Sequence, residues 1–405
     1  MNRVNKRKII DTSLKVITYI ASFIAVIILG AILFFVFSRG SKLLSFKILV
    51  TDYHSKPYRL ETTVSAKGLS FENPHIKDAY FSENFGFAVK DDYTLEGIKT
   101  IRFVYIDDNS PLKTTINEQG EKSPFKEGFI FDSTMRAVLE DESTVTIFSR
   151  YGAENLVNVL SDAVGIQTAN VKSEGGGIRG SIITTLYLIF LTLIIGLPFG
   201  ILTALYLHEI APQNKVTNLL RSFIDMLTGV PSIIFGLMGA AVFIPLTSAL
   251  FSNPDMKRGS VIAGALTLVV IILPVVIKAT ESALSVVPKS YKEGSLALGA
   301  TKTQTIFKIM LPNALPGILS GAILSVGRVI GESAALIFAM GTFIGDKISI
   351  TGRSTSLAVH IWSVMGGEIP NVNLASTIAI IILIVVLALN MSVKVITNRF
   401  MNKYK

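Results

Sequence analysis

Long runs of apolar residues, separated by short polar segments, fill the second half of this chain, and another such run lies close to its start. A helix needs about 20 apolar residues to cross the hydrocarbon core of a bilayer. In lipid, a helix also satisfies its own backbone hydrogen bonds. The pattern therefore predicts six transmembrane helices, over residues 16–37, 181–207, 226–251, 259–277, roughly 313–344, and 374–393.

Residues 41–175 show a different pattern. Segments such as "IRFVYIDD" (101–108) and "STVTIFSR" (143–150) alternate apolar and polar residues, which is typical of half-buried strands. A segment with helical spacing, "ENLVNVLSDAVG", follows at 154–165. We therefore expect three parts: 1–40 with the N-terminus and first span, a soluble strand-rich α+β domain at 41–175, and a five-helix core at 176–405.

The composition favours a membrane protein. Of 405 residues, 50% are hydrophobic and 17% are charged, and the mean hydropathy is +0.55. Cysteine is absent, which excludes disulfides, thiolate metal sites and a cysteine nucleophile. The predicted fold class is an all-α polytopic membrane protein with an inserted α+β domain.

The charges are distributed unevenly along the chain. Residues 41–174 contain 15 Lys and Arg against 20 Asp and Glu, whereas the rest contains 23 against 9. Short basic loops stay on the cytoplasmic side of a membrane, and "MNRVNKRK", 278–308 and "NRFMNKYK" all fall on one side of the predicted spans. We therefore expect a multi-pass protein of the cell membrane with both termini cytoplasmic, an uncleaved first span, and the soluble domain outside.

The segment "GGGIRG" at 175–180 matches the glycine spacing of dinucleotide-binding loops. Such a loop requires a βαβ unit and an acidic residue about 20 positions later. Here a membrane span follows, and "LPFGILTAL" around position 200 contains no acidic residue. We therefore interpret the glycines as a flexible joint between the soluble domain and the membrane.

The basic loop 282–313, between the fourth and fifth spans, carries strong helix signals. Ser290 and Glu293 form the S-x-x-E pattern of a capping box, and Gly299 lies where a glycine ends a helix. Thr301 and Gln304 repeat the box. We expect two short helices with a fixed bend, which by themselves are compatible with a loop lying on lipid headgroups.

The second of these helices is expected to end at Pro312, with Ile306, Ile309 and Met310 along one face. The spacing of the whole loop resembles the EAA loop of permease subunits of binding-protein-dependent ATP-binding cassette (ABC) importers, with Gly-Ser in place of the usual Ala-Ala. This resemblance implies that the loop docks on a separate ATPase subunit. The residues that it assigns to this coupling are Ser290, Glu293, Gly294, Ser295, Gly299, Thr301, Ile309, Leu311 and Pro312.

Three further motifs occur in order: "LTGVPSIIFGLMG" at 227–239, "GRVIGES" at 327–333 and "TSLAVHIW" at 355–362. Together they resemble the PstA-type permease of phosphate-specific ABC importers, from about Gly177 to the C-terminus. The resemblance implies a type I permease fold and a partner set of an ATPase dimer, a PstC-type second permease and an extracytoplasmic phosphate-binding protein. The domain at 41–175 departs from that family.

No G-x-x-x-x-G-K-[ST] motif occurs, so ATP is expected to be used by the partner ATPase and no cofactor by this chain. Lipid is the other expected partner, and no nucleic acid is expected. The histidines and carboxylates of the soluble domain, including His54 and His75, show no metal or triad spacing, which argues against a membrane enzyme.

Arg328 and Glu332 are the unusual residues of the fifth predicted span, because charges are costly inside a membrane helix. Residues four apart on a helix share a face. We expect Arg328 to present its planar fork to phosphate oxygens in the translocation pathway, with Glu332 moderating its charge and accepting the phosphate proton. Ser325 and Ser333 are expected to line the same pathway.

Several alternatives remain open from the residues alone. Arg328 and Glu332 could pair with each other, or with Lys278 or Glu281, to hold the bundle together. The cargo could be another oxyanion, such as sulfate or molybdate, and the chain could be a membrane sensor or scaffold that uses its outer domain. That domain could be a spacer or a docking platform for the binding protein.

Overall fold

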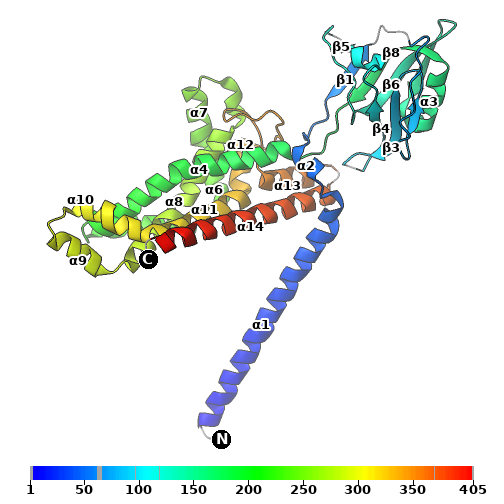
Figure 1. Ribbon diagram of the computed structural model, residues 1–405. Helices are drawn as coiled ribbons and strands as arrows, with labels where there is room; N and C mark the ends of the chain where they lie inside the picture. The colour runs from blue at the N-terminus through cyan, green and yellow to red at the C-terminus, as the bar shows by residue number, and fades with distance from the viewer. Residues whose placement is uncertain (1–2, 62–65, 96, 118, 369, 404–405) are drawn as a thin grey trace. The chain divides into compact units, whose positions relative to one another are not determined.

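The computed structural model describes the chain outside residues 1–2, 62–65, 96, 118, 369 and 404–405 (Figure 1). The described residues form two compact units. Met1–Leu44 and Ser181–Lys405 make up the membrane unit, and Ser45–Gly180 make up the outer unit.

The six predicted spans are confirmed within the described residues. Six helices are long and apolar enough to cross a membrane: Asp11–Leu43, Arg179–Ile210, Ser232–Leu250, Val261–Val286, Lys302–Gly331 and Val372–Ser392. They are built from α1 (Arg3–Gly40), α4 (Arg179–Leu205), α6 (Ser232–Met238), α7 (Ile244–Leu250), α8 (Val261–Val286), α10 (Lys302–Thr305), α11 (Leu311–Gly331) and α14 (Val372–Lys403). Three five-residue π-helical turns, Tyr206–Ile210, Gly239–Phe243 and Ile306–Met310, extend or join them.

The third and fifth spans differ from their predicted bounds. The amphipathic helix α5 (Lys215–Leu227) takes up the start of the predicted 226–251 run, and a new helix begins at Ser232 after Pro231. The predicted run 313–344 is broken, because α11 ends at Gly331 and α12 spans Ala334–Met340. A continuous apolar run therefore indicated one span where the backbone forms a helix, a break and a second short helix.

Helix α8 is the most buried span of the membrane unit, and it packs along α11 (Figure 1). Close approach is possible because α11 carries glycine at the contact: a Cβ on Gly321 would overlap the Cβ of Ala279 on α8. Small residues allow such contact between membrane helices. Gly327 and Gly331 have open space around them instead, so they are not part of this contact.

The outer unit contains one sheet of eight strands within the described residues, and all strand pairings given for it are antiparallel. The order is β2-β3-β4-β6-β8-β1-β5, with β7 paired to β6. The strands are β1 (Pro57–Glu61), β2 (Tyr80–Ser82), β3 (Phe87–Tyr93), β4 (Lys99–Ile106), β5 (Ile116–Asn117), β6 (Ile130–Leu139), β7 (Thr144–Phe148) and β8 (Ala163–Lys172). The predicted strand-rich α+β character is confirmed.

Helix α3 (Gly152–Ser161) covers part of this sheet and buries Leu156 and Leu160. The adjoining core is aromatic: the ring centroid of Phe103 lies 5.3 Å from that of Phe87 and 5.1 Å from that of Phe125. The outer unit thus has a hydrophobic core of its own.

The segment "GGGIRG" is not a flexible joint, contrary to the prediction. It lies against the chain that leaves α2 (Phe46–Val50): Gly176 N donates to Tyr53 O at 2.8 Å, and Gly177 N donates to Asp52 O at 3.0 Å. A Cβ on Gly177 would overlap the Thr51 carbonyl. The glycines therefore allow two backbones to approach closely, and we call these paired segments, 48–55 and 173–179, the tether pair.

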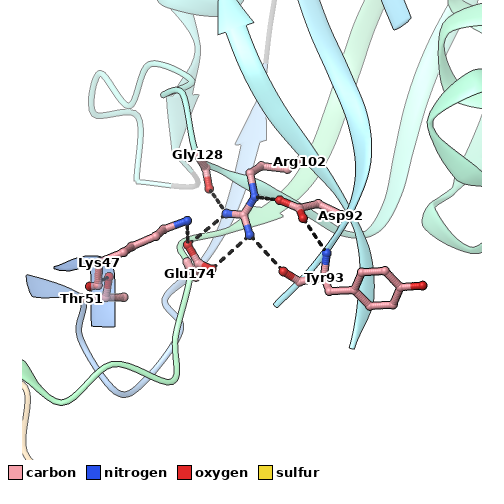
Figure 2. A network of polar contacts seen from close by, with 7 residues as sticks. All are labelled: Lys47, Thr51, Asp92, Tyr93, Arg102, Gly128 and Glu174. Atoms are coloured by element: carbon pink, nitrogen blue, oxygen red, sulfur yellow. Dashed lines mark hydrogen bonds and ion pairs between the residues drawn. The ribbon is translucent and has the colours of Figure 1, made fainter. Parts of the chain in front are cut away.

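A buried arginine fastens the tether pair to the sheet (Figure 2). Arg102 on β4 is only 6% exposed; its Nε donates to Asp92 at 2.6 Å and its terminal nitrogens donate to both oxygens of Glu174 at 3.0 Å. Lys47 also pairs with Glu174, and Arg179 pairs with Asp52. Both segments that lead out of the outer unit are thus bonded to each other and to the sheet.

Candidate functional site

The loop predicted to couple to a partner forms α9 (Lys289–Ala297) followed by α10. The predicted glycine end is confirmed: Gly299 has φ +86°, its N–H donates to Leu296 O at 3.0 Å, and Ala300 N donates to Ser295 O at 3.2 Å. These two hydrogen bonds form a Schellman motif, which ends a helix at a glycine in the left-handed conformation. The predicted box at Ser290 is wrong, because the helix begins at Lys289 after Pro288 and has no side-chain cap.

The capping box at the next turn is confirmed in full. Gln304 N donates to Thr301 Oγ1 at 3.2 Å, and Thr301 N donates to Gln304 Oε1 at 2.9 Å. A further bond joins the two helices of the loop, because the hydroxyls of Ser295 and Thr305 lie 3.0 Å apart. The predicted fixed bend therefore exists between them.

Pro312 does not end the second helix, contrary to the prediction. The chain is helical from Lys302 to Gly331, and the π-helical turn before Pro312 absorbs its missing N–H, with Leu311 N donating to Ile306 O. The Asn313 side chain donates to Ile309 O at 2.6 Å. Ile306 and Met310 are buried as expected and Ile309 is half-buried. The loop thus continues without interruption into the fifth span.

The tip of this loop is exposed and partly apolar. Leu298 is 91% exposed, and Tyr291 and Phe307 are also exposed. Glu293 is exposed, and a Cβ on Gly294 would meet no atom within 4 Å. Exposed apolar side chains beside an open glycine are typical of a surface that a partner covers.

A buried glutamate joins α9 to the end of the second span. The Glu209 side chain is 2% exposed; Lys292 Nζ on α9 lies 2.6 Å from its Oε2, and His208 Nδ1 lies 2.9 Å from its Oε1. His208 Nε2 in turn lies 3.1 Å from Ser285 Oγ on α8. The sequence analysis missed this cluster, although "LYLHEIAP" places an acid at the end of an apolar run.

Two more ion pairs connect α5 to α8. Arg221 NH1 lies 3.0 Å from Glu281 Oε1, and Lys278 Nζ lies 2.8 Å from Asp225 Oδ1. Lys278 and Glu281 therefore have partners other than Arg328, and the alternative in which they pair with it is wrong.

Arg328 and Glu332 do not share a helix face, contrary to the prediction. Glu332 has extended backbone (φ −75°, ψ 120°) beyond the last residue of α11, and its Oε1 accepts a hydrogen bond from Ala335 N at 3.2 Å. Within the described chain, Arg328 forms no ion pair, and its buried Nε has no hydrogen-bond partner. Arg328 is thus a helix residue with an unsatisfied donor, and Glu332 separately caps the start of α12.

The two serines assigned to the pathway have local bonds. Ser325 is fully buried and donates to Gly321 O at 2.9 Å. Ser333 precedes α12, and its carbonyl accepts from Ile337 N at 3.0 Å.

A second polar cluster is buried near the start of α4 and of α13 (Leu357–Met365). Ser181 Oγ lies 2.8 Å from Nδ1 of the fully buried His360, and Thr184 donates to Ser354 at 2.7 Å. The motif "TSLAVHIW" contains this histidine, but Ser181 lies 179 residues earlier. Only the fold reveals the cluster.

The described part of the chain has six helices able to span a membrane and a paired-helix loop continuous with the fifth, which is the architecture of a polytopic membrane protein. Residues 196–405 match the family described as "Binding-protein-dependent transport system inner membrane component", and this chain belongs to that family. It is a multi-pass inner-membrane permease subunit of an ABC importer, and it is not itself the ATPase. Such permeases associate with an ATPase and a binding protein.

The chain is similar to several individual proteins and to a solved structure. The chain is 36% identical over 265 residues to the probable ABC transporter permease protein YqgI of Bacillus subtilis, covering 62% of this chain and 87% of YqgI. It is 35% identical over 191 residues to the phosphate transport system permease protein PstA 2 of Mycobacterium bovis, covering 46% of this chain and 60% of that protein. A chain of the inward-facing MetNI methionine ABC transporter is 24% identical with a TM-score of 0.42, covering 55% and 94%.

Proposed function

We propose that this chain is a PstA-type subunit of an ATP-driven phosphate importer and forms half of its translocation pathway. The observation that carries the proposal is Arg328, whose buried Nε has no hydrogen-bond partner in the described chain. An unsatisfied buried donor is costly, and more so when it is charged. A transported oxyanion would satisfy it, since the guanidinium fork matches phosphate oxygens.

The identity of the oxyanion is supported by the relatives. A PstA protein is 35% identical to this chain over 191 residues. Sulfate and molybdate are the alternatives, because both present similar oxygens to an arginine. Glu332 lies beyond the end of α11, and its carboxylate accepts a hydrogen bond from Ala335 N. We therefore no longer propose that it accepts the proton of phosphate, and we place the selectivity for phosphate over other oxyanions elsewhere in the importer.

Energy coupling is proposed to pass through the loop tip. Lys302–Gly331 is one helix, so a displacement of the tip by a partner ATPase would be transmitted along the span to Arg328. The same proposal places the loop and both termini in the cytoplasm and the outer unit on the side of the binding protein. The partners are an ATPase dimer, a PstC-type second permease and an extracytoplasmic phosphate-binding protein.

The test is phosphate uptake by the reconstituted importer. Arg328→Gln is expected to abolish uptake while the ATPase still assembles, and Arg328→Lys is expected to retain part of it because the charge remains but the fork is lost. Arg258→Gln, at an exposed arginine of the same unit, is the matched control and is expected to transport normally. Normal uptake by Arg328→Gln would refute the proposed role.

Competition separates the possible cargoes. Excess unlabelled phosphate is expected to suppress uptake of labelled phosphate, whereas sulfate and molybdate are expected to leave it unchanged. Stronger suppression by either competitor would assign the importer to that oxyanion while leaving the role of Arg328 intact.

A further inference from the structure

The outer unit contains a cavity of about 320 Å³ beside the tether pair. Its walls come from the first tether at Tyr53 and Ser55, from the second at Ser173 and Gly175, and from the ends of β4, β6 and β8. This volume lies within the range of small-ligand sites, which begins at about 300 Å³. All of these segments belong to the outer unit.

The charge of the cavity wall is opposite to that of the region around it. Among the residues that the structure describes, Lys99, Arg150 and Lys172 line the cavity together with one carboxylate, Asp132, and Lys99 Nζ also lies 3.7 Å from the carboxylate of Asp91 outside the wall. Residues 41–174 as a whole carry more acids than bases. A second, larger cavity of the same unit has the opposite lining, with Lys67 against Glu140, Asp141 and Asp162. A net positive wall is therefore a local property of the first cavity.

Two of these cations are held in place. The Arg150 guanidinium lies 4.8 Å from the ring centroid of Phe148 and 4.9 Å from that of Tyr151, and it donates to the Tyr151 hydroxyl at 3.0 Å. Lys172 Nζ lies 2.6 Å from Asp132 Oδ1. Fixed cations bind an anion with less loss of side-chain entropy than free ones.

Three hydroxyls of the wall have protons that remain free to be donated. Ser173 Oγ accepts from Lys56 N at 2.9 Å, and Thr94 Oγ1 accepts from Ile98 N at 3.2 Å, so both hydroxyl protons remain to be donated. Neither hydroxyl, nor that of Thr100, donates to an acceptor in the part of the chain that the structure describes. A ligand in this cavity would have to supply acceptors.

We propose that this cavity binds a small phosphate monoester. The three cations of the described wall outnumber its one carboxylate and would attract a head group that carries a charge of about −1.5 to −2. The hydroxyls of Thr94, Thr100 and Ser173 would donate to its oxygens. Because the wall contains Ser55 of the first tether and Ser173 of the second, bound ligand would also hold the two tethers together. The site is separate from Arg328 and does not depend on phosphate being the transported cargo.

The test is equilibrium dialysis of labelled glycerol 3-phosphate with the full chain in nanodiscs of phosphatidylcholine, without ATPase or binding protein. One molecule is expected to bind per chain, and Arg150→Gln and Lys99→Gln are each expected to weaken binding about tenfold. Lys113→Gln, at a lysine of the same unit outside the cavity wall, is the matched control. Circular dichroism would verify that all variants are folded.

The other outcomes either overturn the proposal or identify the source of the phosphate monoester. Absence of saturable binding at millimolar ligand would overturn it, as would binding by both cavity variants that equals binding by the unmodified chain. Binding that is lost in Arg328→Gln and kept in Arg150→Gln would place the ligand in the membrane unit. Competition by phosphatidate added to the nanodiscs, with the same sensitivity to Arg150→Gln, would identify a lipid head group as the source of the same phosphate monoester chemistry.

Discussion

Arg328 and Glu332 lie on either side of a helix end: the arginine is in the last turn of α11, and the glutamate accepts a hydrogen bond from Ala335 N in α12. Their spacing of four residues therefore does not bring their charges together. The glutamate instead fixes the break between the two helices, because its carboxylate satisfies one of the free N–H groups at the start of α12.

A glutamine at position 332 keeps an oxygen that can accept this bond, whereas an alanine does not. Glu332→Gln is expected to retain uptake, and Glu332→Ala is expected to lower the free energy of unfolding by about 1 kcal/mol and to speed hydrogen exchange at Ala335. Denaturant titration and exchange mass spectrometry measure the two effects. If Glu332→Gln were as damaging as Glu332→Ala, the negative charge itself would be required.

Glu209 and Lys292 hold α9 against the second span. Lys292→Met leaves a buried carboxylate without its cation and is expected to cost about 1–3 kcal/mol locally, seen as faster exchange throughout α9. It is also expected to raise the number of ATP molecules hydrolysed per molecule transported. The double variant Glu209→Gln/Lys292→Met is expected to recover part of the loss, because no unpaired charge remains.

Lys289→Met is the control for this prediction, since Lys289 is an exposed lysine on the same helix. An equal effect of Lys289→Met and Lys292→Met would show that loss of positive charge on the loop, and not the contact with Glu209, is responsible.

Gly299 is required for its backbone conformation. At φ +86° a β-branched residue is strained, so Gly299→Val is expected to cost about 1–2 kcal/mol and to detach or uncouple the ATPase. Gly299→Asn is expected to be milder, because asparagine tolerates this region. Co-purification of the ATPase and uptake are the measurements, with Gly294→Ala as the control because no atom of the described chain lies within 4 Å of its new Cβ.

The bond between Arg102 and Asp92 predicts a pH dependence of the outer unit. Burial raises the pKa of Asp92, but hydrogen bonds from Arg102 and from Tyr93 N outweigh it, so the pKa lies below its ordinary value. The pKa of Asp52 is also lowered: burial raises it, and Lys56 and Arg179 outweigh this effect. As the pH falls, the unfolded carboxylates take up protons first, near pH 3.9. The stability that Asp92 and Asp52 contribute to the outer unit is therefore complete above that pH. It is lost as the pH falls through their lower pKa values in the folded protein.

Hydrogen exchange of the outer-unit amides in the full chain, followed from about pH 5 downward, is therefore expected to report falling stability after correction for intrinsic exchange. Arg102→Gln is expected to weaken the dependence of stability on pH. Lys113→Gln, which removes an exposed ion pair with Asp108, is expected to leave that dependence unchanged. A stability that does not fall over this range in the unmodified chain would contradict the role of these carboxylates.

The sequence by itself determined the features that depend on neighbouring residues. The six spans follow from contiguous apolar length, because lipid requires it wherever the chain crosses. The capping box of Thr301 and Gln304 and the glycine end at Gly299 follow from bonds within five residues. The alternating strands β4 and β7 were found for the same reason.

The tertiary structure alone decided the features that depend on distant segments. Glu209 meets Lys292 across 83 positions, and the glycines after Glu174 pack against Thr51 instead of forming a joint. The sequence also placed Arg328 and Glu332 on one helix face, where the backbone in fact breaks. Neighbouring residues determine the length of an apolar run and the hydrogen bonds within a few positions. The close contact of Gly177 and the partner of Glu209 depend instead on which distant part of the chain folds against them.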